Sequence, residues 1–121
     1  MKGKSLHLCR WLMILLAYAG GSEVWAQTEG FASYYHSRFH GRVSSSGRSH
    51  DKEELVAAHR TYPFGTFLRV TNVKNMKSVI VCVTDRGPRS RKRLVDVSEQ
   101  VAELLDFKQQ GVAKVRIEEV P

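Results

Sequence analysis

The sequence predicts a small, mainly β fold: a closed barrel of short strands with one short helix. Segments of strand composition recur along residues 30–120 and are separated by turn residues. Only residues 98–110 have the apolar spacing typical of a helix. After the first 26 residues a single cysteine, Cys82, remains, so no internal disulfide can form. Several strands, one helix and no disulfide in so short a chain favour a barrel over a sandwich.

Residues 1–26 have the pattern of a cleaved secretory signal peptide. Three cations precede an apolar run at residues 11–19 that is too short to span a bilayer, and small residues favour cleavage after Ala26. We expect residues 27–121 to form one monomeric domain, periplasmic or secreted, without a stable membrane anchor. The full sequence has a net charge of +7, and the part after residue 26 keeps an excess of cations. For an exported basic chain an anionic envelope polymer is a better candidate partner than nucleic acid, which would require interleaved aromatic and basic residues.

The first half of the domain is predicted as strand, long loop and strand. Residues 30–35 have strand composition. The polar loop at residues 37–51 has a length that is usually functional in a compact domain. Residues 53–59 are compatible with a short helical turn or with an extended segment leading into the next strand. Residues 67–73 alternate between apolar and polar side chains, as a half-buried strand does.

Residues 79–84 are predicted as the central strand. The run is apolar and rich in β-branched side chains, and Gly87-Pro88 after it can continue neither a strand nor a helix. We expect the strand to bury Cys82. Asp85 and Arg86 should then lie at the mouth of the sheet, held by a rigid element but facing solvent.

The last third of the domain is predicted as strand, helix and strand. A basic loop at residues 89–93 leads to a short strand at residues 94–97. Ser98 then provides an N-cap for a helix that Gly111 stops. The apolar face of this helix carries Val101, Leu104 and Leu105. Residues 112–120 alternate again and close the sheet.

Seven short motifs occur in the order and spacing of one known family. They are Gly30-Phe31-Ala32-Ser33-Tyr34-Tyr35, Phe39-His40-Gly41-Arg42, Ala57-Ala58-His59-Arg60-Thr61, Val70-Thr71-Asn72, Thr84-Asp85-Arg86-Gly87-Pro88, Val95-Asp96-Val97-Ser98 and Gly111-Val112-Ala113-Lys114-Val115. Over nearly all of residues 29–119 the sequence therefore resembles the rare lipoprotein A (RlpA) family. The resemblance implies a six-stranded double-psi β-barrel and lytic transglycosylase activity on peptidoglycan glycan strands, with a preference for strands stripped of their stem peptides. It implies no cofactor, and the four histidines after residue 26 lack the spacing of metal ligands.

The resemblance also implies roles for individual residues. Asp85 takes the position of the catalytic aspartate, and His59 that of an active-site histidine. A lytic transglycosylase protonates the departing glycosidic oxygen and then removes the proton of the muramic acid 6-hydroxyl as a 1,6-anhydro ring closes, so one carboxyl can act first as acid and then as base. Substrate contacts are expected from Tyr35, Arg48, Arg86 and Asp96. The basic loop follows Asp85 closely, so it could contact an anionic glycan or simply be solvated.

Each candidate also has a purely structural interpretation. Asp85 could cap the turn that follows it, and His59 could be a core histidine whose hydrogen bonds are satisfied. Asp96 could line the cleft or accept hydrogen bonds from amides near the helix start. Tyr34 and Tyr35 point to opposite faces of a strand, so only one should face the cleft, and the family pattern favours Tyr35.

One position departs from the family pattern, because Arg48 stands where the family has a glutamate. A carboxylate there would raise the pKa of Asp85 from about 3.9 and help to keep it protonated, whereas a guanidinium would lower it. Three alternatives follow: a neighbouring carboxylate replaces the glutamate, His59 donates the proton as an imidazolium, or the protein is a non-catalytic, expansin-like glycan-binding module. The neighbouring carboxylates are Asp51, Glu53 and Glu54.

Overall fold

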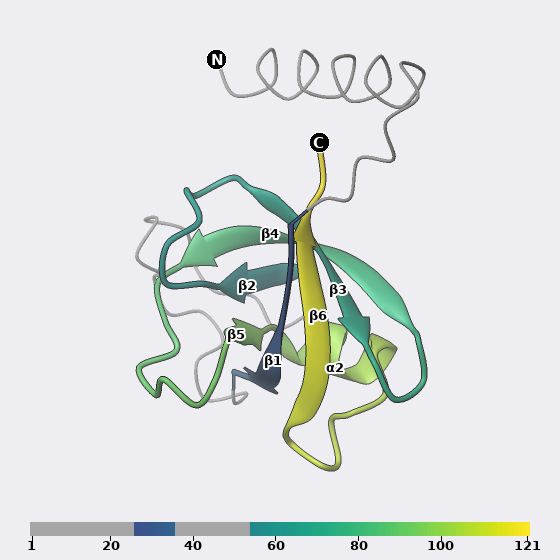
Figure 1. The fold of residues 1–121 in the computed structure, drawn as a ribbon. Coiled ribbons are helices and arrows are strands. Elements are labelled where there is room, and N and C mark those ends of the chain that lie inside the picture. Colours follow the sequence, from purple (N-terminus) through teal and green to yellow (C-terminus); the bar gives the residue numbers. More distant parts are fainter. Residues whose placement is uncertain (1–25, 36–53) are drawn as a thin grey trace, which may run out of the picture.

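The structure is a computed structural model that describes residues 26–35 and 54–121 (Figure 1). The predicted secretory signal at residues 1–26, except Ala26, and the whole long polar loop at residues 37–51, with Arg48, lie outside the described residues. In the described part the elements are β1 (Gln27–Tyr34), β2 (Val56–Ala58), β3 (Phe67–Asn72), β4 (Ser78–Asp85), β5 (Val95–Val97), α2 (Glu99–Leu104) and β6 (Ala113–Glu119). The ambiguous segment at residues 53–59 therefore contains a strand, not a helical turn.

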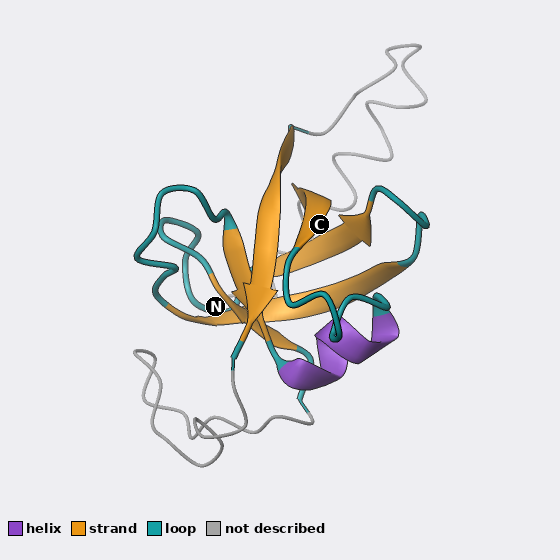
Figure 2. Cartoon of the chain, turned by 90° about the horizontal axis from the view of Figure 1, so that it is seen from below, coloured by secondary structure: helices purple, strands orange, loops and turns teal. Residues whose placement is uncertain are grey.

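The strands close into a barrel in the order β1-β5-β2-β4-β3-β6 (Figures 1 and 2). β1 pairs in parallel with β5, and β2 pairs in parallel with β4. The other neighbouring strands are antiparallel. The prediction of a mainly β, closed barrel with one short helix is confirmed for the described residues.

The core lies inside the barrel and follows the alternation of the strands. β3 contributes Leu68 and Val70 to it, β6 contributes Val115 and Ile117, and all four are buried. Period-two alternation explains why their neighbours on the same strands face outward. Each strand thus supplies one face to a shared apolar interior.

The apolar composition of the central strand suggested that both of its faces are buried, but only one face is. Val81 and Val83 of β4 are fully buried, but Ile80 is 44% exposed and Cys82 is only partly buried. The expectation that the strand buries Cys82 is therefore wrong. The reason is geometric: a barrel strand has one inner and one outer face, and Ile80 and Cys82 lie on the outer one.

The helix is shorter than predicted and is capped differently. α2 ends at Leu104, and Asp106 leaves the helix with a left-handed φ of 62°, so Gly111 does not stop it. Leu104 is 45% exposed, so its predicted place on the buried face is wrong. Ser98 stands at the N-cap position, yet its hydroxyl makes no capping bond and donates to the Glu54 carbonyl oxygen instead. No helix in the described part of the chain has the length and apolar character needed to cross a membrane.

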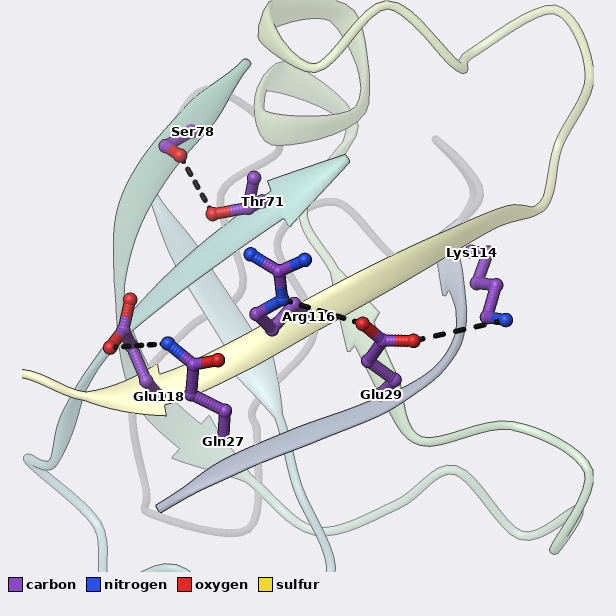
Figure 3. Close-up of polar contacts among 7 residues, drawn as sticks. All are labelled: Gln27, Glu29, Thr71, Ser78, Lys114, Arg116 and Glu118. Carbon is purple, nitrogen blue, oxygen red and sulfur yellow. Dashed lines mark hydrogen bonds and ion pairs between the residues drawn. The ribbon is translucent and has the colours of Figure 1, made fainter. Parts of the chain in front are cut away.

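Polar side chains form a ladder on the outer face of β1 and β6 (Figure 3). Glu29 pairs with Lys114 at 3.8 Å and with Arg116 at 3.4 Å. Gln27 donates to Glu118 at 3.3 Å. These groups are solvent-exposed, so each ion pair contributes less than about 1 kcal/mol to stability.

Candidate active site

Two aspartates lie in register on either side of β2. Ala58 of β2 pairs with Asp85 of β4 and with Asp96 of β5. A bulge produces this register, because Ala57 pairs with Val83 and the next β2 residue pairs with Asp85. Side chains paired across neighbouring strands share a face of the sheet, so the two carboxylates lie on one side, with Cα atoms roughly 10 Å apart across two strand spacings. Ala58, which lies between them, is itself buried.

The Asp85 carboxylate is held from two directions. Its Oδ1 accepts a hydrogen bond from the Arg86 amide at 2.8 Å, and its Oδ2 accepts one from the Tyr35 hydroxyl at 3.3 Å. Its backbone carbonyl accepts a bond from the His59 amide at 3.1 Å. Gly87 then takes a φ of 138°, which favours glycine and lets the chain turn away from the strand. Asp85 is thus fixed at the end of β4 and half-buried.

Tyr35 reaches from the end of β1 to Asp85. Its backbone amide donates to Val97 of β5 at 3.0 Å, which anchors the residue beside the two aspartates. Burial, and then the negative charges of Asp85 and Asp96, raise the pKa of the Tyr35 phenol well above its usual range. The phenol is therefore protonated and acts as a hydrogen-bond donor. Tyr34 points elsewhere, with its ring edge-on to Phe107 at 6.2 Å.

His59 follows β2 directly and is 8% exposed. Its Nδ1 accepts backbone N–H bonds from Thr61 at 3.1 Å and from Tyr62 at 3.2 Å. Burial, followed by the charges of Arg60 and Arg86, lowers the pKa of the imidazole below its usual value. An imidazolium would carry a proton on Nδ1 and could not accept these bonds. The geometry therefore favours a neutral ring with its proton on Nε2 and opposes the alternative in which an imidazolium donates the proton.

Arg86 ties the loop that carries His59 to the end of β4. Its Nη1 donates to the carbonyl oxygens of His59 at 3.2 Å and of Tyr62 at 2.8 Å. Its guanidinium also lies over the Phe64 ring, 4.0 Å from the ring centroid. These contacts hold residues 59–64 against the strand end.

Asp96 accepts a hydrogen bond from the Ser33 hydroxyl through Oδ1. Ser33 and Asp96 pair across β1 and β5, so the row Ser33, Asp96, Ala58, Asp85 crosses four neighbouring strands. Within the described residues, the hydrogen bond that the Asp96 carboxylate accepts comes from Ser33, and the amides at the start of α2 donate none to it.

Several candidates lie outside the geometry described above. Arg48, Asp51 and Glu53 are outside the described residues. Glu54 is described, and its carbonyl oxygen accepts the Ser98 hydroxyl bond next to β2. Sequence reasoning missed Ser33, for which the only available signal was that it shares a strand face with Tyr35.

A separate hollow of about 450 Å³ lies away from Asp85, at the opposite end of β4. Its lining includes Lys74 and Asn75 of the hairpin that precedes β4, together with Phe31 and Lys114. It is not part of the aspartate row. Across residues 26–35 and 54–121, no three His, Cys, Asp or Glu side chains group closely enough to hold a metal ion.

Comparison with known proteins places the chain in a family. The family model described as lytic transglycolase matches residues 27–117. The endolytic peptidoglycan transglycosylase RlpA of Neisseria meningitidis serogroup A is 50% identical over 91 residues, which are 75% of this chain and 38% of that protein. The RlpA protein of Rickettsia prowazekii is 48% identical over 95 residues, covering 76% of this chain and 30% of the relative. The chain thus spans well under half the length of these relatives.

Solved structures agree on the fold. The Streptomyces papain inhibitor superposes with a TM-score of 0.65 at 20% identity and covers 79% of this chain and 96% of its own. A Clavibacter michiganensis expansin in complex with cellohexaose superposes with a TM-score of 0.64 at 20% identity, covering 79% of this chain and 51% of its own. The predicted six-stranded double-psi β-barrel is confirmed, as is the resemblance to the RlpA family. The chain belongs to the lytic transglycolase family.

Proposed function

We propose that this protein is a peptidoglycan lytic transglycosylase that cleaves peptide-free glycan strands and leaves 1,6-anhydro-muramic acid ends. The observation that carries the proposal is the Asp85 carboxylate, half-buried at the end of β4 and in register with a second carboxylate, Asp96. The relatives in Neisseria and Rickettsia are named endolytic peptidoglycan transglycosylases. Residues 1–26 would direct the barrel to the periplasm or the cell exterior, where this substrate lies.

In the proposed reaction Asp85 works twice. It first gives its proton to the glycosidic oxygen, so that the C–O bond breaks with both electrons leaving on that oxygen and the sugar becomes oxocarbenium-like. The 6-hydroxyl of the same sugar then attacks the anomeric carbon, and Asp85 takes the hydroxyl proton back. No water enters the product, and the carboxyl returns to its starting state.

Neighbouring residues position Asp85 and the sugar. Tyr35 is a protonated donor that orients the Oδ2 atom of Asp85. Ser33 holds one oxygen of Asp96, so the other oxygen can face the positive charge that develops on the sugar. Arg86 acts as a positioning residue, because it holds the His59 loop against the strand end. The neutral His59 could donate a hydrogen bond through Nε2 to a sugar hydroxyl.

The alternative is a non-catalytic glycan-binding module. It is favoured by Arg48, which replaces the family's glutamate with a cation, and by the fold shared with an expansin that binds cellohexaose. An enzyme needs a proton donor that Arg48 does not disable, whereas a binder needs only a basic, aromatic surface.

One assay separates the two functions. The purified protein is incubated with sacculi stripped of stem peptides, and 1,6-anhydro-muramic acid ends are counted by mass spectrometry. We expect Asp85→Asn to abolish these ends. Asp106→Asn, the same change on the far side of the barrel in a left-handed conformation that asparagine tolerates, should leave them unchanged.

Two results would contradict the catalytic proposal. Anhydro ends that survive Asp85→Asn would remove Asp85 from the mechanism. Their absence from the wild-type reaction, with the glycan still sedimenting with the protein, would establish the binding module. An Arg48→Glu variant then tests the sequence departure directly, because it should raise the yield of anhydro ends if Arg48 suppresses catalysis.

A further inference from the structure

The loop between β4 and β5 carries four cations within five residues. We call residues 89–93 the cationic turn; its charged members are Arg89, Arg91, Lys92 and Arg93. The first three are exposed and the fourth is partly exposed. The proposed reaction uses none of them.

The charge of the cationic turn is not neutralised within the described part of the chain. The ion pairs seen there involve other cations, on β3, on β6 and after α2: Arg69, Lys108, Lys114 and Arg116. A concentration of unpaired like charges costs free energy through self-repulsion, and an anionic ligand would relieve it.

Hydrogen bonds hold the backbone of the cationic turn in one shape. Arg60 donates through Nη1 to the carbonyl oxygens of Pro88 at 2.9 Å and of Ser90 at 3.2 Å. Within the turn, the Arg93 amide donates to the Ser90 carbonyl oxygen at 3.1 Å, and the Lys92 amide donates to the Ser90 hydroxyl at 3.2 Å. Because the backbone is already ordered, binding a ligand would cost less conformational entropy than it would in a mobile loop.

The same bonds place the cationic turn beside the aspartate row. Arg60 follows His59 directly, and the carbonyl of Pro88, which it binds, lies three residues after Asp85. A polymer bound at Asp85 would therefore pass close to the turn. Unlike the two aspartates, the turn carries the positive charge that attracts an anion.

We propose that the cationic turn binds carboxylates along the glycan strand and thereby holds the polymer at Asp85. In peptide-free strands each muramic acid carries a free lactyl carboxylate, and a planar guanidinium can bind a carboxylate through two parallel hydrogen bonds. The identity of the polymer rests on the proposed function. Carboxylate binding by the turn does not require cleavage, since none of these cations touches the reacting atoms in the proposed mechanism.

The test compares two double variants that lose the same charge. Arg89→Gln/Arg91→Gln removes two cations from the turn. The control, Lys74→Gln/Lys77→Gln, removes two exposed cations from the hairpin at the opposite end of β4. Both are made in an Asp85→Asn background, so that no cleavage occurs, and thermal unfolding checks that each variant is folded.

Binding is measured to soluble peptide-free glycan and to a chitooligosaccharide, which has a similar sugar backbone without the lactyl carboxylate. We expect the turn variant to raise the Kd for the peptide-free glycan about fivefold at low salt, with little difference from the parent at about 0.5 M salt, since exposed ion pairs are weak and screened. The control should bind as its parent does. Binding to the chitooligosaccharide should be the same in all three proteins.

The inference is overturned if both double variants weaken glycan binding equally, if neither does, or if the turn variant loses chitooligosaccharide binding to the same extent. Its failure is distinguishable from that of the proposed function, because the latter is read from anhydro ends in proteins with Asp85 intact. If anhydro ends form but glycan binding does not depend on the turn, the transglycosylase function stands and the proposed role of the cationic turn is wrong. If glycan binding depends on the turn but no anhydro ends form, the role of the cationic turn stands and the protein is a non-catalytic binding module.

Discussion

His59 is held at Nδ1 by two backbone amides, and this contact decides what the residue can do. A ring that accepts at Nδ1 can donate only from Nε2, so it can orient a sugar hydroxyl but carries no positive charge. The surrounding guanidiniums of Arg60 and Arg86 act in the same direction, because a second and third positive charge disfavour an imidazolium. The proton of the proposed reaction is therefore assigned to Asp85.

A pH titration of stability tests this environment. Because the folded-state pKa of His59 lies below its unfolded value of about 6.5, the unfolded chain binds the proton first as pH falls. The free energy of unfolding contributed by His59 is thus present above about pH 6.5 and is lost as pH falls through the folded-state pKa. His59→Asn can keep the two amide bonds through its side-chain oxygen but does not titrate. Urea unfolding between about pH 7.5 and pH 5 should show a smaller stability loss in His59→Asn than in the wild type; equal losses would show that His59 is protonated without penalty.

At the scale of elements, local patterns predicted the strands better than the site. Alternating or β-branched runs located β3, β4 and β6 to within a residue or two, because each face of a barrel strand meets one constant environment. The register that brings Asp85 and Asp96 to the same β2 residue could not be predicted, since it depends on a bulge in β4, where Thr84 is the extra residue, and on pairing between segments far apart in the sequence. Alternation predicted that only one of Tyr34 and Tyr35 faces the site, and the resemblance to the family was needed to select Tyr35.

Ser98 shows how tertiary contacts override a local capping signal. Its hydroxyl binds the Glu54 carbonyl oxygen, so it fastens the segment leading into β2 to the start of α2. Ser98 is fully buried, so Ser98→Ala removes a hydrogen bond at a buried hydroxyl, and we expect a loss of about 1 kcal/mol in the free energy of unfolding. Hydrogen exchange should then quicken at the amides of residues 55–58 more than in the first turn of α2. The reverse order would show that Ser98 acts chiefly on the helix.

A matched change on the surface gives the control for this prediction. Ser78→Ala also removes a hydroxyl that shares a hydrogen bond, at 2.7 Å with Thr71, but on the outer face of the barrel (Figure 3). Thr71 is buried but Ser78 is exposed, so water can take the place of the Ser78 hydroxyl and the cost should stay within about 0.5 kcal/mol. A loss as large as that of Ser98→Ala would mean that burial does not decide the value of these hydroxyl bonds.

For the whole molecule, two sets of contacts join β1 and β6: the apolar interior and the polar ladder of Figure 3. Ile117 is fully buried where β6 faces the core, so Ile117→Ala removes apolar contacts and leaves a cavity. Glu29→Gln removes both ion pairs of a side chain that is 46% exposed, where water and salt already weaken each pair.

We therefore expect the barrel to be held by its interior. Ile117→Ala should lower the free energy of unfolding by about 2–5 kcal/mol, independently of salt. Glu29→Gln should lower it by less than about 1 kcal/mol at low salt and by still less at about 1 M NaCl, because the Debye length there is only about 3 Å. Urea unfolding of both variants at the two salt concentrations measures these differences. If Glu29→Gln cost as much as Ile117→Ala, closure of the barrel would depend on the ion pairs of its outer face. Substitutions in the cationic turn would then have to be checked for a loss of stability before a change in glycan binding was assigned to them.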